Sequence, residues 1–212
     1  MRPIFVSGIG TGVGKTIVAA ILTEILEANY WKPIQAGYEN GTDTDLVKSL
    51  LSNSRTIIHS ETYKFEAAVS PHIAARNENR RVDLNRIAED FHKLNSERPL
   101  VIEGAGGLLV PLNEKEFVID LVKQLDAVLI LVSRNYLGSI NHSLMTANTC
   151  RSYGIVPGGW VFNDNYLNYE IEIAEWSGFP VLFSVPFMDS ISKQTLSIAA
   201  QRIDLSYLYS LL

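Results

Sequence analysis

The stretch FVSGIGTGVGKTIVAA, Phe5 to Ala20, holds residues whose types and spacing suit chemistry on a phosphate group. Glycines let backbone N–H groups close around an oligophosphate, and a helix N-terminus adds partial positive charge. Lys15 would reach the β- and γ-phosphates, and the Thr16 hydroxyl would bind magnesium. The alternative is a glycine-rich turn that binds nothing. It is disfavoured because strand, glycines, Lys-Thr and helix follow in the order that phosphate binding needs.

Two carboxylates are placed where they could hold magnesium. Asp45 follows a Gly-Thr-Asp-Thr loop and could act directly or through water, although Asp43 or Asp45 could instead only cap a helix. Glu103 ends an apolar strand just before Gly-Ala-Gly-Gly, and a buried strand rarely ends in Glu unless the charge has a partner. Magnesium beside a γ-phosphate would be such a partner. The alternative for Glu103 is a turn with a strained backbone.

Lys32 lies inside an otherwise apolar stretch, Tyr-Trp-Lys-Pro-Ile-Gln. Pointing into a crevice, it would supply a fixed positive charge near a transferring phosphate or a substrate carboxylate. The alternative is a lysine that protects an edge strand from aggregation.

Two further segments offer polar groups at strand ends. The segment 137–142, Leu-Gly-Ser-Ile-Asn-His, joins a strand to a helix, and its N–H groups could hold a carboxylate, or Ser139 and Asn141 could be ordinary caps. Asn163 and Asp164 end another strand, where an amide could bind a purine edge or form an Asx-turn.

These residues need elements that bring them to one edge. Hydrophobic patterns predict strands or extended segments over 4–7, 30–35, 57–65, 100–103, 127–132, 158–162 and 181–185. They predict helices over 17–28, 46–51, 71–76, 84–94, 118–125, 139–153 and 166–176, and from about 197. Because strands alternate with helices, we expect an α/β fold with a mostly parallel sheet covered on both faces. Ligands in such sheets lie beyond the carboxyl ends of the strands, where these motifs fall.

Composition limits the function further. A chain of 212 residues, 47% of them apolar, fits one domain, 1–212. The phosphate-loop motif in a chain of alternating strands and helices predicts a P-loop NTPase-like fold for this domain. The net charge of −5 argues against a general nucleic-acid surface. The longest apolar run, 127–132, is too short to span a membrane, and a strand begins almost at once, which argues against a signal peptide. Cys150 is the only cysteine, so we expect no internal disulfide and a cytoplasmic protein.

Together these motifs resemble the dethiobiotin synthetase family, from the first strand to about Met188. The family's extended loop Gly-Thr-Asp-Thr-x-Val-Gly-Lys-Thr corresponds to residues 8–16, which accounts for five residues between Gly8 and Gly14 where the usual loop has four. The other matching segments are Lys-Pro-x-x-x-Gly at 32–37, the magnesium Asp at Asp45, Ser-Pro-His at 70–72, Glu-Gly-Ala-Gly-Gly at 103–107 and Gly-Ser-Ile-Asn-His at 138–142.

The resemblance implies a ligase of biotin biosynthesis that uses ATP and Mg²⁺ to form the ureido ring of dethiobiotin from 7,8-diaminononanoate and CO₂ or bicarbonate. One amine forms a carbamate, whose oxygen attacks the γ-phosphate and gives a carbamic-phosphoric anhydride. The second amine attacks that carbon, phosphate leaves and the ring closes. The resemblance also implies a homodimer in which the segment 137–141 serves the neighbouring subunit's site, with no nucleic-acid or membrane partner.

The family's functional positions are carried over residue by residue. Those implied for catalysis are Thr11, Lys15 and Lys32. Those for ATP are Gly12, Val13, Gly14, Lys15, Thr16, Ile17, Asp45, Glu103, Gly104, Ala105, Gly106, Asn163, Asp164, Pro186, Phe187 and Met188. Those for the substrate are Thr11, Lys32, Ala36, Gly106, Gly107, Leu137, Gly138, Ser139, Ile140 and Asn141, and those for magnesium are Thr16, Asp45 and Glu103.

The chain departs from the family pattern at several positions. Gly10 replaces the loop Asp, and Ile9 the preceding Thr. Ala36 stands where the family usually offers a hydroxyl, which Gln35 could replace, and Tyr136 stands where Lys is common. Because the chain past residues 186–188 is short, we also expect weaker selectivity for purine nucleotides than in relatives.

Three other interpretations compete. A regulatory ATPase of the septum-positioning or partition class shares the fold, but carries an extra lysine where this chain has Gly10. A cobyrinate-amidating enzyme needs a glutaminase domain, for which 212 residues leave no room. A nucleotide-binding module without activity is compatible with Gly10 and Ala36. Retention of the charged positions argues against it, namely Lys15, Lys32, Asp45 and Glu103.

Overall fold

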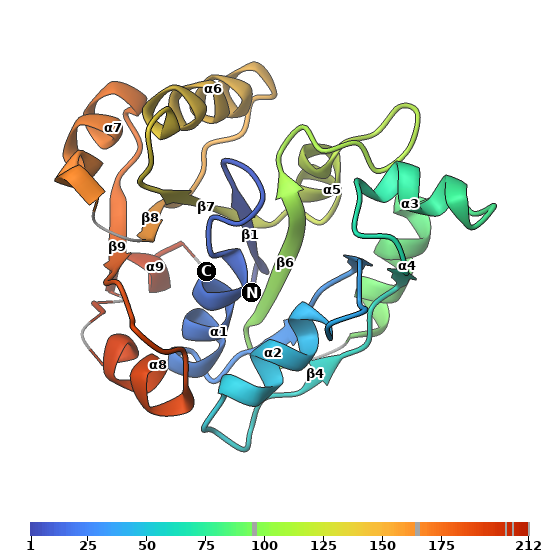
Figure 1. Cartoon of the computed structure of the whole chain (residues 1–212), viewed down its shortest axis with the longest axis horizontal. Coiled ribbons are helices and arrows are strands. Elements are labelled where there is room, and N and C mark those ends of the chain that lie inside the picture. The colour runs from blue at the N-terminus through green and yellow to red at the C-terminus, as the bar shows by residue number, and fades with distance from the viewer. Residues whose placement is uncertain (95–96, 164–165, 202, 205, 212) are drawn as a thin grey trace.

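A parallel seven-stranded sheet forms the centre of the protein, with the strand order β4-β2-β6-β1-β7-β8-β9 (Figure 1). The computed structural model describes residues 1–94, 97–163, 166–201, 203–204 and 206–211. The strands of this sheet are β1 (Ile4–Gly8), β2 (Asn29–Trp31), β4 (Ile58–His59), β6 (Leu100–Gly107), β7 (Val128–Arg134), β8 (Gly159–Asn163) and β9 (Val181–Val185). A separate parallel pair is formed by β3 (Ile34–Ala36) and β5 (Tyr63–Phe65).

Helices cover both faces of the sheet. They are α1 (Lys15–Ile25), α2 (Asp43–Leu50), α3 (Pro71–Asn77), α4 (Leu84–Lys93), α5 (Val118–Gln124), α6 (Ser139–Ser152), the 3₁₀ turn η1 (Tyr166–Asn168), α7 (Glu170–Ser177), α8 (Lys193–Ala200) and α9 (Ser206–Tyr209). Figure 1 shows α6 and α7 on one side of the sheet and α1 and α8 on the other. The fold predicted from the sequence is therefore confirmed.

Successive side chains of each strand point to opposite faces of the sheet, and this divides the core into two layers. In β1, Ile4 and Val6 belong to the cluster formed with α1 and α8, whereas Phe5 belongs to the cluster formed with α5, α6 and α7. All three side chains are fully buried. A strand buried on both faces is the arrangement expected at the centre of a parallel sheet.

The expected strand over residues 30–35 is wrong in one respect. It is two strands, β2 and β3, that belong to different sheets and are separated by Lys32 and Pro33. Proline has no N–H and cannot donate to a strand ladder. The Pro33 carbonyl instead accepts the Tyr63 N–H at 2.9 Å, at the start of the pairing with β5. The chain therefore leaves the main sheet at Lys32.

Several other boundaries differ from those expected. The helices α1 and α2 begin at Lys15 and Asp43, earlier than predicted, and β6 continues through the glycines to Gly107. The helix expected over 166–176 is interrupted, because η1 ends at Asn168 and α7 begins at Glu170. The earlier starts place the first residues of α1 and α2 at the sheet edge.

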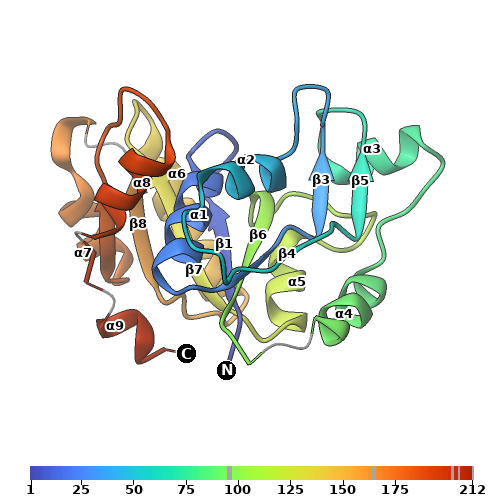
Figure 2. The ribbon, with the colours of Figure 1, turned by 90° about the horizontal axis from the view of Figure 1, so that it is seen from below.

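The carboxyl ends of the central strands meet at one edge. In Figure 2 this edge is at the top, where the loops that follow β1 and β3 rise, and the N-terminus lies at the bottom. None of the helices in the described ranges is long and apolar enough to cross a lipid bilayer.

Candidate active site

A cavity of about 640 Å³ opens beside the loop that follows β1. Its walls come from this loop, the connection between β2 and β3, the start of α2, the N-terminus of α3 and the end of β6. The predicted site residues that line it are Thr11, Gly12, Gly14, Lys15, Thr16, Ile17, Lys32, Ala36, Glu103, Ala105 and Gly106. Segments far apart in the sequence thus converge on one cavity.

The loop ends in a helix start that is open to an anion. Gly14 has φ 93°, and a Cβ there would overlap the side-chain amide of Asn163. That amide donates to the Val13 carbonyl at 3.0 Å and so fixes the loop. The helix α1 has no side-chain N-cap, so its first N–H groups remain available for a phosphate.

The Lys15 side chain folds back into the loop. Its ammonium donates to the Gly10 carbonyl at 2.9 Å, and 7% of the residue is exposed. Burial lowers the pKa of Lys15 to about 8. A phosphate bound within the loop would restore a favourable partner for this charge.

A lysine and two carboxylates form the centre of the site. The Lys32 ammonium lies 2.8 Å from Asp43 Oδ2 and 3.1 Å from Glu103 Oε1. The Thr16 hydroxyl donates to Glu103 Oε1 at 2.8 Å and lies 3.2 Å from Asp43 Oδ1. Lys32 and Glu103 are 4% and 1% exposed, so water has little access to these two side chains.

Opposite charges stabilise this cluster against burial. Burial alone would lower the pKa of Lys32, but Glu103 and Asp43 raise it above the ordinary value. Burial alone would raise the pKa of Asp43, but the Lys32 ammonium lowers it below the ordinary value. The lysine and Asp43 therefore both stay charged around neutral pH.

The structure does not place Asp45 in the site. Asp45 Oδ2 accepts the N–H and the hydroxyl of Thr42 at 3.1 and 2.7 Å, while Thr42 Oγ1 accepts the Asp45 N–H at 3.0 Å. This capping box starts α2, as the capping alternative supposed. Residues two apart on a helix do not face each other, so Asp43 points at Thr16 when Asp45 caps. The predicted position of Asp45 in the site is therefore wrong, and Asp43 is the carboxylate that faces Thr16.

Alanine substitutions at the two aspartates should separate these roles. Asp43→Ala should raise the Mg²⁺ concentration needed for half-maximal ATP hydrolysis by about tenfold or more, because a charged oxygen donor is lost. Asp45→Ala should leave the Mg²⁺ dependence unchanged and lower only the thermal unfolding midpoint. An Mg²⁺ dependence disturbed equally in both variants would contradict the correction.

Two residues near the site have roles that the sequence did not reveal. Tyr30 is fully buried, and its hydroxyl donates to Glu103 Oε2 at 2.7 Å. In the sequence Tyr30 looks like any core aromatic residue of a strand. The amide of Gln35 accepts the Asp43 N–H at 3.2 Å and donates to the Gly37 carbonyl at 2.7 Å. Gln35 therefore holds the start of α2 as well as lining the cavity.

The segment 137–141 lies outside this cavity. Leu137 is 97% exposed, whereas Ser139 is buried and its hydroxyl lies 2.7 Å from the Tyr169 hydroxyl. The N-cap of α6 is Gly138, with φ 101° and no side-chain cap, so neither Ser139 nor Asn141 caps the helix. The segment therefore contributes no residue to the wall of the cavity in its own chain.

Some residues carried over for ATP or substrate also do not line the cavity. They are Val13, Gly104, Gly107, Asn163, Pro186, Phe187 and Met188. Asp164 lies outside the described residues. Phe187 is exposed and the Asn163 amide binds the loop, and the purine-binding role of these residues stays a prediction. Weak purine selectivity stays a prediction.

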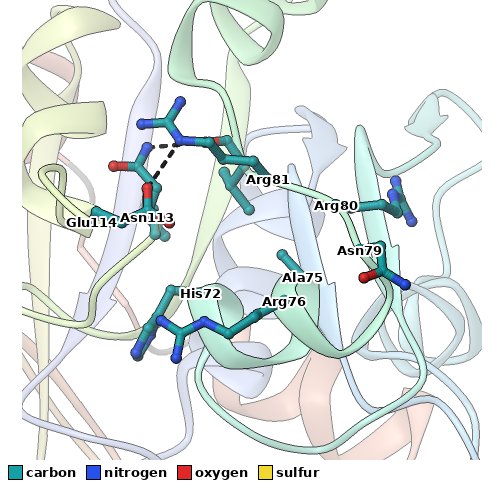
Figure 3. A pocket seen from close by; sticks show the side chains of 10 residues that line it. His72, Ala75, Arg76, Asn79, Arg80, Arg81, Asn113 and Glu114 are labelled. Carbon is teal, nitrogen blue, oxygen red and sulfur yellow. Dashed lines mark hydrogen bonds and ion pairs between the residues drawn. The ribbon is translucent and has the colours of Figure 1, made fainter.

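A second hollow, of about 170 Å³, lies between α3 and the segment 112–114 (Figure 3). It is rich in cations, but Arg81 binds Glu114 at 2.9 Å, and Arg80 binds Glu78 at 3.2 Å and lies over the Phe65 ring. These contacts engage the guanidinium groups of Arg80 and Arg81, two of the three that line the hollow.

The parallel sheet, the glycine loop and the buried lysine–carboxylate cluster define a P-loop nucleotide-binding protein. The family model described as "AAA domain" matches residues 2–195. Solved structures of similar fold include a ParA family ATPase from Chlorobium tepidum, with a TM-score of 0.59 and 12% identity over 96% of this chain and 100% of that one. A chain of the MinC:MinD cell division protein complex from Aquifex aeolicus has a TM-score of 0.59 and 14% identity, with 95% of each chain covered. At such identity the likeness concerns the fold alone.

Sequence relatives identify the family within this class. The ATP-dependent dethiobiotin synthetase BioD of Cytophaga hutchinsonii is 45% identical over 96% of this chain and 97% of its own. That of Paramagnetospirillum magneticum is 39% identical over 93% and 94%, and that of Lawsonia intracellularis 38% over 91% of each. The chain belongs to the dethiobiotin synthetase family, as its motifs indicated.

Proposed function

We propose that this protein is an ATP-dependent dethiobiotin synthetase of biotin biosynthesis. It would form the ureido ring from 7,8-diaminononanoate, CO₂ and ATP, and work in the cytoplasm, where ATP is supplied. The observation that carries the proposal is the position of Lys32, which lies within 3.1 Å of Asp43 and Glu103 beside the phosphate loop. A ligase that phosphorylates a carbamate needs positive charge at that point.

The oxygen atoms of the cluster fit Mg²⁺. Thr16, Asp43 and Glu103 offer a hydroxyl and two carboxylates on one side of the cavity, and hard cations prefer oxygen ligands. Within the described ranges, no three His, Cys, Asp or Glu side chains group around one point, so the phosphates of ATP would complete the site. When bound, the ion neutralises charge on the β- and γ-phosphates.

The chain's own residues would position the reactants. The N–H groups at the start of α1 and the Lys15 ammonium would hold the β- and γ-phosphates. Lys32 would neutralise the carbamate and the phosphoryl oxygens as the carbamate oxygen attacks, while Thr11 on the cavity wall would contact the carbamate. The second amine would then attack the carbamate carbon. Phosphate would leave with the oxygen that had joined it to that carbon.

We also propose a homodimer in which each subunit's segment 137–141 binds the distant carboxylate of the substrate in the other subunit. The exposure of Leu137 supports the proposal, as does the absence of this segment from the wall of its own chain's cavity. N–H groups at the start of α6, which has no side-chain cap, suit a carboxylate. Neither a nucleic acid nor a membrane is required as a partner.

Mixing two inactive variants should test this dimer. Lys15→Ala lacks the phosphate site, and Asn141→Asp places a negative charge against the substrate carboxylate. After mixing and subunit exchange, activity should return, because each heterodimer contains one intact site. A mixture as inactive as its components, at a concentration where the protein is dimeric, would contradict a shared site.

The function is tested by measuring ATP hydrolysis with and without 7,8-diaminononanoate and bicarbonate. We expect ADP and phosphate to form in step with a cyclic urea, detected by mass spectrometry, and little hydrolysis when either substrate is omitted. Hydrolysis that is independent of the diamine would favour a regulatory ATPase instead.

A further inference from the structure

One carboxylate oxygen in the site depends on a residue outside the cavity. Glu103 Oε1 faces Thr16 and Lys32, at 2.8 and 3.1 Å. Glu103 Oε2 faces the other way and accepts the Tyr30 hydroxyl at 2.7 Å. Because 1% of Glu103 is exposed, water cannot readily replace that donor.

The sheet explains why these two side chains meet. Tyr30 in β2 lies opposite Val101 in β6, and Glu103 follows two residues later on the same face. Both Tyr30 and Val101 belong to the core cluster under α1. The ring therefore packs like a core residue, while its hydroxyl reaches Glu103 in the middle of the neighbouring strand.

We propose that Tyr30 is a positioning residue for the metal site: its hydroxyl fixes the orientation of Glu103, so that Oε1 faces Thr16 and the cation. The inference rests on the proposed function and deepens it. Tyr30 does not line the cavity, so it acts through Glu103 and not on the nucleotide. Residues that orient ligands in this way typically change metal affinity by about 10- to 100-fold when they are mutated.

Tyr30→Phe removes this hydroxyl and keeps the ring. The measurement is the affinity for ADP by calorimetry, first in EDTA and then in excess Mg²⁺, using the whole chain. We expect the EDTA affinity to stay within twofold of wild type and the gain in affinity on adding Mg²⁺ to fall by about tenfold. The matched control is Tyr63→Phe, which removes a buried hydroxyl that accepts the Asp83 N–H at 3.1 Å, away from the cavity. It should keep the full gain.

A double-mutant cycle shows whether Tyr30 acts through Glu103. The measured quantity is again the increase in ADP affinity on adding Mg²⁺. Adding Tyr30→Phe to the Glu103→Gln protein should change this increase much less than adding it to wild type, because the effects of substitutions at contacting residues are not independent. Equal effects in both backgrounds would overturn the proposal.

The other outcomes are equally decisive. Tyr30 would have a role in the core alone if the Tyr30→Phe protein gained as much ADP affinity on adding Mg²⁺ as wild type does. The same conclusion would follow if its ADP affinity fell as much in EDTA as in Mg²⁺. A wild-type protein that binds ADP no better with Mg²⁺ counts against the proposed function itself, so the two failures can be distinguished.

Discussion

Lys15→Ala should abolish phosphate release without unfolding the protein. Lys15 is the cation inside the phosphate loop, with its ammonium 2.9 Å from the Gly10 carbonyl. Negative charge gathers on the phosphates as they are transferred, and removal of a preorganised donor to such charge costs about 10²- to 10³-fold in rate. Because Lys15 would also bind the ground-state phosphates, ATP affinity should fall with the rate.

The experiment compares Lys15→Ala with Lys48→Ala, which removes an exposed lysine from the last turn of α2. Both variants should show the wild-type circular dichroism spectrum, since the methylene chain of Lys15 adds little to the core. Only Lys15→Ala should lose phosphate release. Wild-type turnover in that variant would show that the loop does not hold the reacting phosphates.

Lys32→Ala should lower the turnover rate by about 100- to 1000-fold, since it removes positive charge where negative charge develops. The Michaelis constant for ATP should change much less, because Lys15 and the start of α1 still hold the nucleotide. The readout is phosphate release at saturating diamine and bicarbonate, with Lys48→Ala as the control. A rate within twofold of wild type would reduce Lys32 to a structural role.

The same variant gives a second result. In the free protein the Lys32 ammonium lies between Asp43 and Glu103, the two carboxylates that we propose as Mg²⁺ ligands. Ammonium and metal ion therefore compete for the same oxygens. Without nucleotide, Lys32→Ala should bind Mn²⁺, measured by electron paramagnetic resonance, more tightly than wild type. Equal or weaker Mn²⁺ binding would mean that the carboxylates hold the metal without displacing the lysine.

The phosphate loop could be predicted from the sequence because its chemistry is local. Gly14, Lys15 and Thr16 are adjacent in the chain, and their roles follow from one turn and the helix that it opens. The order of strands and helices could also be predicted, since each pattern depends on its own residues. Lys32 and Glu103 were found because a charged residue in an apolar strand needs a partner.

The remaining parts of the site depend on non-local geometry. The choice between Asp43 and Asp45 depends on the residue that starts α2, since that start decides which carboxylate faces Thr16. The contact between Tyr30 and Glu103 depends on β2 lying beside β6, strands separated by about seventy residues of sequence. No pattern along the chain specifies that neighbour.

The fold alone would not have separated the possible functions. ParA and MinD proteins share it at 12–14% identity. Proteins of this fold differ in function because of the side chains at the edge of the sheet. In this chain one of these side chains is the lysine at the break after β2. In this chain the break is made by Pro33, which ends the ladder next to Lys32.

The central claim is that the cluster around Lys32 promotes attack of a carbamate oxygen on the γ-phosphate. It is tested most directly by supplying ¹⁸O-labelled bicarbonate with ATP and 7,8-diaminononanoate, in a reaction too short for the label to exchange with water. We predict that the released phosphate carries an oxygen atom from bicarbonate, because phosphate leaves with the oxygen that attacked it. Phosphate that carries an oxygen atom from the solvent instead would contradict the account.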